Sequence, residues 1–177
     1  ISPFPQDQVD QAVQVDGVSL CLRPIKPEDA PLLVDLFDSL SPTSVYHRFF
    51  SPLKSLPHDM LVRFTQIDYD REMALVAIRT EQDAEVMLGV ARVIGTPGGE
   101  EGEFAVVVAD AWQGRGIGAE LLQRCLDIAK ERGMRTVHGT ALRQNRKMVE
   151  LARRLGFEVR LDQEENQYDM RIRWDDS

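Results

Sequence analysis

The sequence predicts an α/β fold of the α+β type, in which helices flank a mixed and mostly antiparallel sheet. Two observations point to this class. Short apolar segments follow one another through tight turns between residues 73 and 108, as hairpin-connected strands do. Segments with apolar residues at three- and four-residue spacing stand between such groups of strands. We expect about six to seven strands and about four to five helices.

Length and composition fit one domain. A chain of 177 residues buries enough surface to fold without disulfides or a structural metal. Cys21 and Cys125 lie far apart, fit no metal-ligand spacing, and are interpreted as reduced cysteines of a cytoplasmic protein. No apolar run reaches the roughly 18 residues of a membrane span, and no secretory leader appears. We therefore expect no metal and no membrane association.

Residues 1–15 are predicted to be a tail or linker, because they combine two prolines with several Gln and Asp residues. The domain itself is expected to span residues 16–177. The chain does not begin with methionine, and we interpret it as a piece of a longer protein.

The first half of the domain is expected to hold one strand and three helices. Residues 18–23 form the strand. Glu28 and Asp29 open the first helix, since the positive end of the helix dipole favours anions, and its apolar face runs to Leu40. Pro42 and Pro57 begin two short helices whose aromatic residues are interpreted as core.

The second half is expected to hold most of the sheet. Strands at residues 73–79 and 86–94 form a hairpin joined by a polar turn at 80–85. A turn at 96–99 leads into a buried strand whose apolar run begins at Phe104, and the next helix ends at Gly133. The remaining elements are expected to be a strand at 135–142, a helix at 145–155 that ends at Gly156, and strands at 157–161 and 168–174.

A glycine-rich turn follows the buried strand, and we call residues 113–119 the glycine loop. Glycines stand at positions 114, 116 and 118, and the apolar periodicity of a helix begins at Ile117. The first N–H groups of a helix have no intrahelical acceptor, and glycines allow an anion to approach the backbone. The loop therefore predicts a ligand that carries phosphate.

Two familiar phosphate loops do not fit. A Walker loop would end in Gly-Lys followed by a hydroxyl residue, which this loop lacks. The dinucleotide fingerprint would need an acidic residue about 20 positions further on, at the end of the next strand. Residues 136–143 contain no Asp or Glu, and the loop follows a hairpin instead of opening a βαβ unit.

Charge is unevenly distributed along the chain. Residues 1–112 carry a net charge of −10, residues 113–160 of +6, and residues 161–177 of −4. Solvated helix faces would account for the charges but not for their separation by sign. A polyanionic ligand on the second half and a basic partner on the first would account for both. The net charge of −8 argues against nucleic acid as a partner.

The glycine loop and a later segment resemble the GCN5-related N-acetyltransferase (GNAT) family. Two motifs carry this resemblance: Gln113-x-x-Gly116-x-Gly118 for the pyrophosphate loop, and Asn145, Leu151 and Leu155-Gly156-Phe157 for the second motif. Within the family, the chain resembles the acetyltransferase domain of Pat-type bacterial protein lysine acetyltransferases. The phrases that carry this are Leu22-Arg23-Pro24-Ile25, Ser41-Pro42, Tyr46-x-Arg48-Phe49-Phe50-Ser51-Pro52, the run 65–74, and Glu103-Phe104-Ala105-Val106.

The resemblance implies acetyl-CoA as co-substrate, bound where the central strand splays from its neighbour. The pantetheine arm would pair with the main chain of Val106 and Val108 and would be reached by Asn145. The pyrophosphate would rest on the amides of the glycine loop, which are those of Gln113, Gly114, Arg115, Gly116, Ile117, Gly118 and Ala119.

Acetyl transfer to lysine needs a base, because deprotonating an amine of pKa about 10.4 near neutrality costs roughly 4 to 5 kcal/mol. Glu103 occupies the position that resembles the catalytic glutamate of Pat-type proteins, although its sequence position fits an exposed glutamate at the start of a strand equally well. As a base it would need partial desolvation or an ordered water. Direct attack is expected, without a covalent intermediate on Cys125 or Cys21.

One departure from the family concerns the leaving thiolate. Many relatives have a tyrosine where this chain has Ala152, and Tyr46 and Tyr69 are substitutes without positional support. His47, His58 and His138 are interpreted as structural or surface residues.

The resemblance therefore implies a protein lysine acetyltransferase that acts on an exposed lysine. It further implies an acyl-CoA synthetase as the acceptor protein and a fusion to an upstream domain. Two alternatives remain. One is acetylation of a small-molecule amine, and the other is an acyl-CoA-sensing module without turnover.

Overall fold

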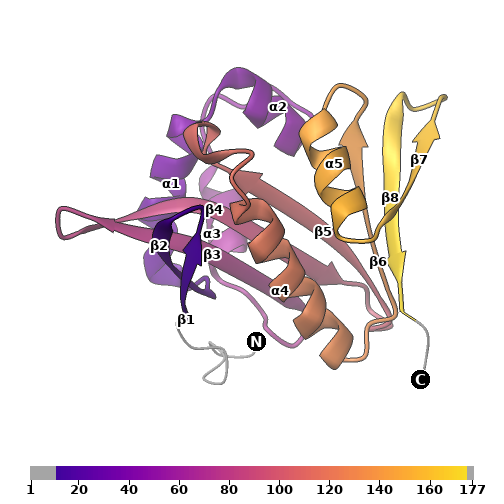
Figure 1. The fold of residues 1–177 in the computed structure, drawn as a ribbon, viewed down its shortest axis with the longest axis horizontal. Helices are drawn as coiled ribbons and strands as arrows, with labels where there is room; N and C mark the ends of the chain where they lie inside the picture. The colour runs from indigo at the N-terminus through magenta and orange to yellow at the C-terminus, as the bar shows by residue number, and fades with distance from the viewer. Residues whose placement is uncertain (1–10, 175–177) are drawn as a thin grey trace.

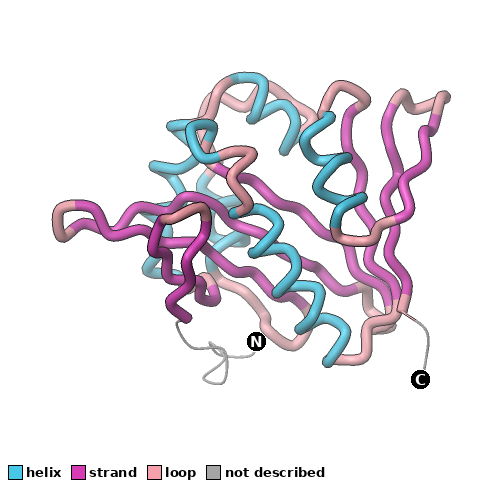
Figure 2. The backbone as a smooth tube through the Cα atoms, in the orientation of Figure 1, coloured by secondary structure: helices cyan, strands magenta, loops and turns pink. Residues whose placement is uncertain are grey.

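The computed structural model describes residues 11–174, which form one sheet with helices on both faces (Figures 1 and 2). The strand order is β1-β2-β3-β4-β5-β6-β8-β7. All neighbouring strands are antiparallel except β5 and β6, which confirms the mixed sheet. The strands are β1 (Gln11–Val15), β2 (Val18–Pro24), β3 (Glu72–Glu81), β4 (Ala84–Gly95), β5 (Glu101–Val108), β6 (Thr136–Leu142), β7 (Glu158–Asp162) and β8 (Gln167–Arg173).

The helices lie in two layers. In Figure 1, α4 and α5 cover the near face of the sheet, and α1 and α3 lie behind it. Helix α2 lies at the upper edge, beside the end of β5. The bounds are α1 (Ala30–Ser39), α2 (Pro42–Phe49), α3 (His58–Thr65), α4 (Ile117–Glu131) and α5 (Arg146–Arg154), with the short 3-10 turns η2 (Pro27–Asp29) and η3 (Asp110–Trp112).

The sheet has one strand more than the upper expectation, because the predicted tail is not all tail. Residues 11–15 form β1, which pairs with β2 through the tight turn at Asp16 and Gly17. Residues 1–10 lie outside the described residues. The predicted tail is therefore too long, because its last five residues belong to an edge strand of the sheet.

The β3–β4 hairpin is also longer than predicted. Only Gln82 and Asp83 form its turn, both with positive φ (49° and 64°), and the strands extend on either side. A two-residue turn with positive φ at both positions matches the right-handed twist of paired strands. The polar residues on either side of it therefore belong to strands.

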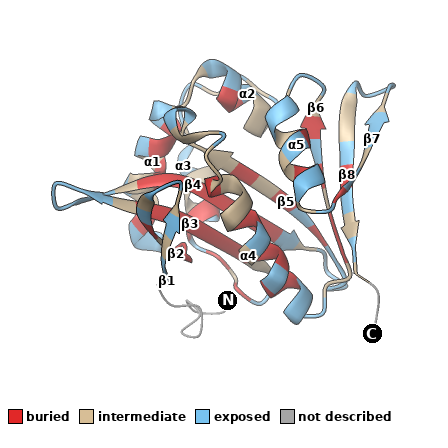
Figure 3. Cartoon of the chain, viewed as in Figure 1, coloured by how far each residue is buried: buried red, intermediate tan, exposed pale blue. Residues whose placement is uncertain are grey.

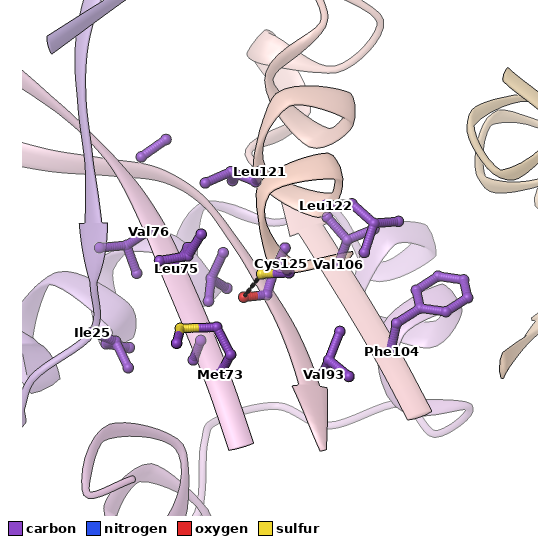
Figure 4. Close-up of a cluster of buried hydrophobic side chains, with 14 of the residues drawn as sticks. Ile25, Met73, Leu75, Val76, Val93, Phe104, Val106, Leu121, Leu122 and Cys125 are labelled. Atoms are coloured by element: carbon purple, nitrogen blue, oxygen red, sulfur yellow. Dashed lines mark hydrogen bonds between the residues drawn. The ribbon is translucent and has the colours of Figure 1, made fainter. Parts of the chain in front are cut away.

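The core lies mainly between α4 and the centre of the sheet (Figures 3 and 4). Leu121, Leu122 and Cys125 recur at helical spacing on α4 and are fully buried against β3, β4 and β5. The thiol of Cys125 donates to the carbonyl oxygen of Ala91 at 3.5 Å. Burial of this stripe fixes the start of α4, and hence the glycine loop, against the end of β5.

Strands β5 and β6 separate soon after they pair. Only Glu101, Gly102 and Glu103 have partners on β6. The ring of Phe104 then packs over Gly139, where a Cβ would lie 2.5 Å from the ring, and its centroid lies 4.9 Å from that of Phe157. The predicted splay therefore begins directly after Glu103.

Candidate active site

A cleft of about 800 Å³ opens where β5 leaves β6. Its walls are helix α2, strand β5, the glycine loop, the first turn of α4 and helix α5 along its length. The cleft therefore joins the glycine loop at one end of β5 to Glu103 near the other.

The glycine loop has the geometry that an anion site requires. Gly114 and Gly116 have φ values of 74° and 98°, in the left-handed region that disfavours other residues. Gly116 is the N-cap of α4 and offers no side-chain cap, so the N–H groups of the first turn lack an intrahelical acceptor. The helix dipole adds positive potential at the same point.

The main chain of β5 presents alternate peptide groups to the cleft. The N–H of Ala109 donates to Leu88 on β4 at 2.8 Å, whereas the carbonyl of Glu100 accepts from Arg135 on the side of β6 at 2.7 Å. Peptide groups alternate along a strand. Those of Val106 and Val108 therefore face away from β4, where β6 no longer provides partners.

Gln113 connects three walls of the cleft. Its Nε2 donates to the carbonyl of Val108 at 3.0 Å and to the hydroxyl of Ser44 on α2 at 3.2 Å. Its Oε1 accepts from Lys147 Nζ on α5 at 3.1 Å. This residue fixes the entrance to the glycine loop.

Most of the predicted site residues line the cleft, whereas the side chains of two point elsewhere, although it is their backbone amides that were predicted to bind. Arg115 turns away: its Nε donates to Asp16 at 2.7 Å, and its guanidinium carbon lies 4.2 Å from the centroid of Trp112. The side chain of Ile117 is 2% exposed and belongs to the core. The predicted residues that line the cleft are Glu103, Val106, Val108, Gln113, Gly114, Gly116, Gly118, Ala119 and Asn145.

Asn145 has a structural role as well as a place in the cleft. Its Oδ1 accepts from the N–H of Met148 at 3.2 Å and so caps α5. This bond uses the oxygen of the amide, and the donor function of the side chain belongs to a separate atom, Nδ2.

Glu103 is exposed and lies on the face of β5 opposite α4. His138 lies beside it on β6, in parallel register. To act as a base, this carboxylate would need either a bound acceptor that shields it from solvent or an ordered water that relays the proton.

Three cleft residues were not identified as site residues from the sequence. His47 and Arg48 reach the cleft from α2, and Lys147 from α5. Burial lowers the pKa of His47. Burial, together with the positive charges of Arg92 and Arg63, lowers the pKa of Arg48 to about 10, although Glu103 opposes the change. The interpretation of His47 as a structural or surface residue is therefore incomplete.

No tyrosine takes the place of Ala152, which is completely buried. The phenol of Tyr69 donates to the carbonyl of Ile25, and burial raises its pKa. Neither Tyr69 nor Tyr46 is among the residues that line the cleft.

The thiol of Cys125 is fully buried, and burial raises its pKa to about 12. Within residues 11–174, no three His, Cys, Asp or Glu side chains are arranged to hold a metal ion. In the same part of the chain, none of the helices has the length and apolar character needed to cross a membrane.

A family model described as an acetyltransferase (GNAT) domain matches residues 19–158. A curated acetyltransferase of Pseudomonas aeruginosa is 31% identical over 142 residues, which cover 80% of this chain and 76% of the relative.

Solved structures agree with this match. The GNAT domain of S. lividans PAT superposes with a TM-score of 0.86 at 28% identity, covering 97% of this chain and 100% of that one. A cAMP-binding acyltransferase from Mycobacterium smegmatis has a TM-score of 0.64 at 25% identity. It matches 94% of this chain, which spans only 47% of that longer protein.

Proposed function

The chain belongs to the GNAT acetyltransferase family, and from that premise we propose that it transfers acetyl to a lysine side chain of a protein. The family makes it an acetyl-CoA-dependent N-acetyltransferase. The lysine acceptor, the base and the residues that bind CoA are parts of the proposal.

One observation carries it: β5 has the glycine loop beyond one end and Glu103 near the other, and between them peptide groups that β6 does not pair face the cleft. A CoA thioester with its pyrophosphate on the loop would extend along Val106 and Val108 as an added strand. Its acyl carbon would then lie toward Glu103.

The reaction would proceed by direct attack. Glu103, directly or through a water, accepts a proton from the lysine ammonium. The amine nitrogen bonds to the thioester carbon, and a β5 peptide N–H stabilises the oxyanion. The adduct then loses the second nitrogen proton to solvent water, and its carbon–sulfur bond breaks, giving the acetylated lysine and CoA thiolate. A thiolate of ordinary pKa leaves without needing an acid at position 152.

The lysine acceptor is supported by the resemblance to Pat-type enzymes and by the structural similarity to S. lividans PAT. An acyl-CoA synthetase is the acceptor that this resemblance favours. A cytoplasmic location and an upstream domain belong to the same proposal. Transfer to a small amine, and binding of acyl-CoA without turnover, are the alternatives.

Incubation with radiolabelled acetyl-CoA and an acyl-CoA synthetase separates these functions. Label on a specific lysine, located by mass spectrometry, supports the proposal. Turnover with free amines alone, or tight CoA binding without release of thiol, contradicts it. A synthetase in which the labelled lysine is replaced by arginine is the control.

A further inference from the structure

Arg48 differs from Arg23 and Arg92, the arginines that are buried in the described part of the chain. Arg23 pairs with Asp29 at 2.6 Å, and Arg92 pairs with Glu72 at 3.2 Å. A buried cation normally has such a partner, because an unpaired one is costly to desolvate.

Arg48 is half-buried, and within residues 11–174 it has neither an ion pair nor a hydrogen bond. Its contacts are aromatic: the guanidinium carbon lies 4.9 Å from the ring centroid of Phe49 and 5.5 Å from that of Phe64. These rings hold the side chain in place without satisfying its donors.

Arg48 lies between the cleft and a small apolar pocket that is lined by Phe49 and Phe64. In the described part of the chain, every fully buried side-chain nitrogen has a hydrogen-bond partner. The nitrogens of Arg48 have none, so they are not fully buried. Arg48 lines the cleft together with Glu103. Among the described residues these two side chains form no ion pair, so the cation and the anion are not in direct contact.

We propose that Arg48 binds a carboxylate next to the acceptor amine, so that the enzyme prefers lysines that have an acidic neighbour. The inference rests on the proposed function, since Glu103 would receive the ammonium group. A guanidinium offers a planar pair of donors that matches a carboxylate. An acceptor with an amine alone would bring a second cation near Arg48 and leave its donors unmatched.

Short lysine peptides test this directly. Each peptide has glutamate at one position within two residues of the lysine, and its partner has glutamine there. We expect wild-type kcat/KM to favour one glutamate peptide by about tenfold, as for a hydrogen bond to a charged group. Arg48→Met should lower kcat/KM for that peptide to the value for its glutamine partner. Arg48→Lys should keep part of the preference.

Arg63→Met is the matched control. Arg63 also lies 5.5 Å from the ring of Phe64, but it is exposed on α3 and does not line the cleft. Arg63→Met removes a cation contact with the same ring and should keep the full preference for the glutamate peptide. Equal kcat/KM for all peptide pairs in the wild type, or equal losses for both peptides in Arg48→Met, would overturn the inference.

Two further readouts separate this inference from the proposed function. The affinity of the same peptides for the complex of the enzyme with CoA tests Arg48 even if no peptide is acetylated. A preference for the glutamate peptide that is lost in Arg48→Met supports the inference, and equal affinity of the wild type for both peptides overturns it. Acetylation of free amino acids alone, when it depends on Arg48, supports carboxylate binding but contradicts a protein acceptor.

Discussion

Lys147 Nζ lies 3.1 Å from Gln113 Oε1 and so connects α5 to the glycine loop across the cleft. An ammonium group binds a phosphate more strongly than it binds a neutral amide, because the hydrogen bond is then assisted by charge on both partners. A CoA phosphate on the loop would therefore compete with Gln113 for Lys147.

Replacing Lys147 by methionine should weaken acetyl-CoA binding. We expect Kd to rise about tenfold, the usual effect of losing one charge-assisted hydrogen bond, and the loss to shrink at high salt. Isothermal titration calorimetry at two ionic strengths measures both effects. Arg153→Met is the control, since Arg153 is exposed on α5 but does not line the cleft. Equal losses in the two variants would contradict a specific role for Lys147.

Two glycines of the loop should respond differently to alanine. At Gly116 the φ of 98° is unfavourable for any side chain, so Gly116→Ala should lower the free energy of unfolding by roughly 1 to 2 kcal/mol. At Gly118 a Cβ would meet Val108, Leu151 and Val106 at 3.4 to 3.8 Å, which the fold tolerates.

Gly118→Ala should therefore keep its stability but raise the Kd for acetyl-CoA, because the added methyl group enters the cleft. Urea unfolding and calorimetry separate the two effects. Normal CoA affinity in a stable Gly118→Ala protein would place the ligand elsewhere.

The two cysteines should differ in reactivity. A pKa of about 12 leaves about one Cys125 thiol in ten thousand ionised at pH 8, and the residue is fully buried. Cys21 is half-buried on β2. We expect iodoacetamide to label Cys21 first in the native protein and Cys125→Ala to keep its acetyltransferase activity. Mass spectrometry that found acetyl on Cys125 during turnover would contradict direct attack.

The Arg23–Asp29 pair should be important for stability. Both side chains are almost completely buried, and Asp29→Ala would leave a buried guanidinium with its carboxylate removed, at a cost of about 3 kcal/mol in the free energy of unfolding. Glu158 pairs with Arg160 at 2.8 Å, but both are well exposed, so Glu158→Ala should change stability by about 0.5 kcal/mol or less. Urea unfolding of the two variants gives the comparison, and similar losses would contradict it.

The elements and the glycine loop were predictable because their signals are local. Helical spacing in α4, the left-handed glycines and the capping Asn145 all lie within a few residues of what they determine. Strand β1 was missed because five residues of an edge strand carry a weak pattern and depend on pairing with β2.

The side-chain positions in the site that the sequence does not reveal come from contacts between distant residues. Arg115 leaves the cleft for Asp16, which lies 99 positions earlier in the sequence. Arg48 enters it because Phe64, on another helix, supports its side chain. Such partners are set by tertiary packing, and no spacing along the chain reveals them.

The central claim is that Glu103 accepts the proton of the attacking amine. Its most direct test is the single-turnover rate of acetyl transfer by Glu103→Gln, with acetyl-CoA saturating and the acceptor fixed. His47→Gln is the comparison, because His47 also lines the cleft. We predict a loss of about 10² to 10⁴-fold for Glu103→Gln, with unchanged Kd for acetyl-CoA, and a much smaller loss for His47→Gln. An unchanged rate in Glu103→Gln, or the larger loss in His47→Gln, would contradict the assignment.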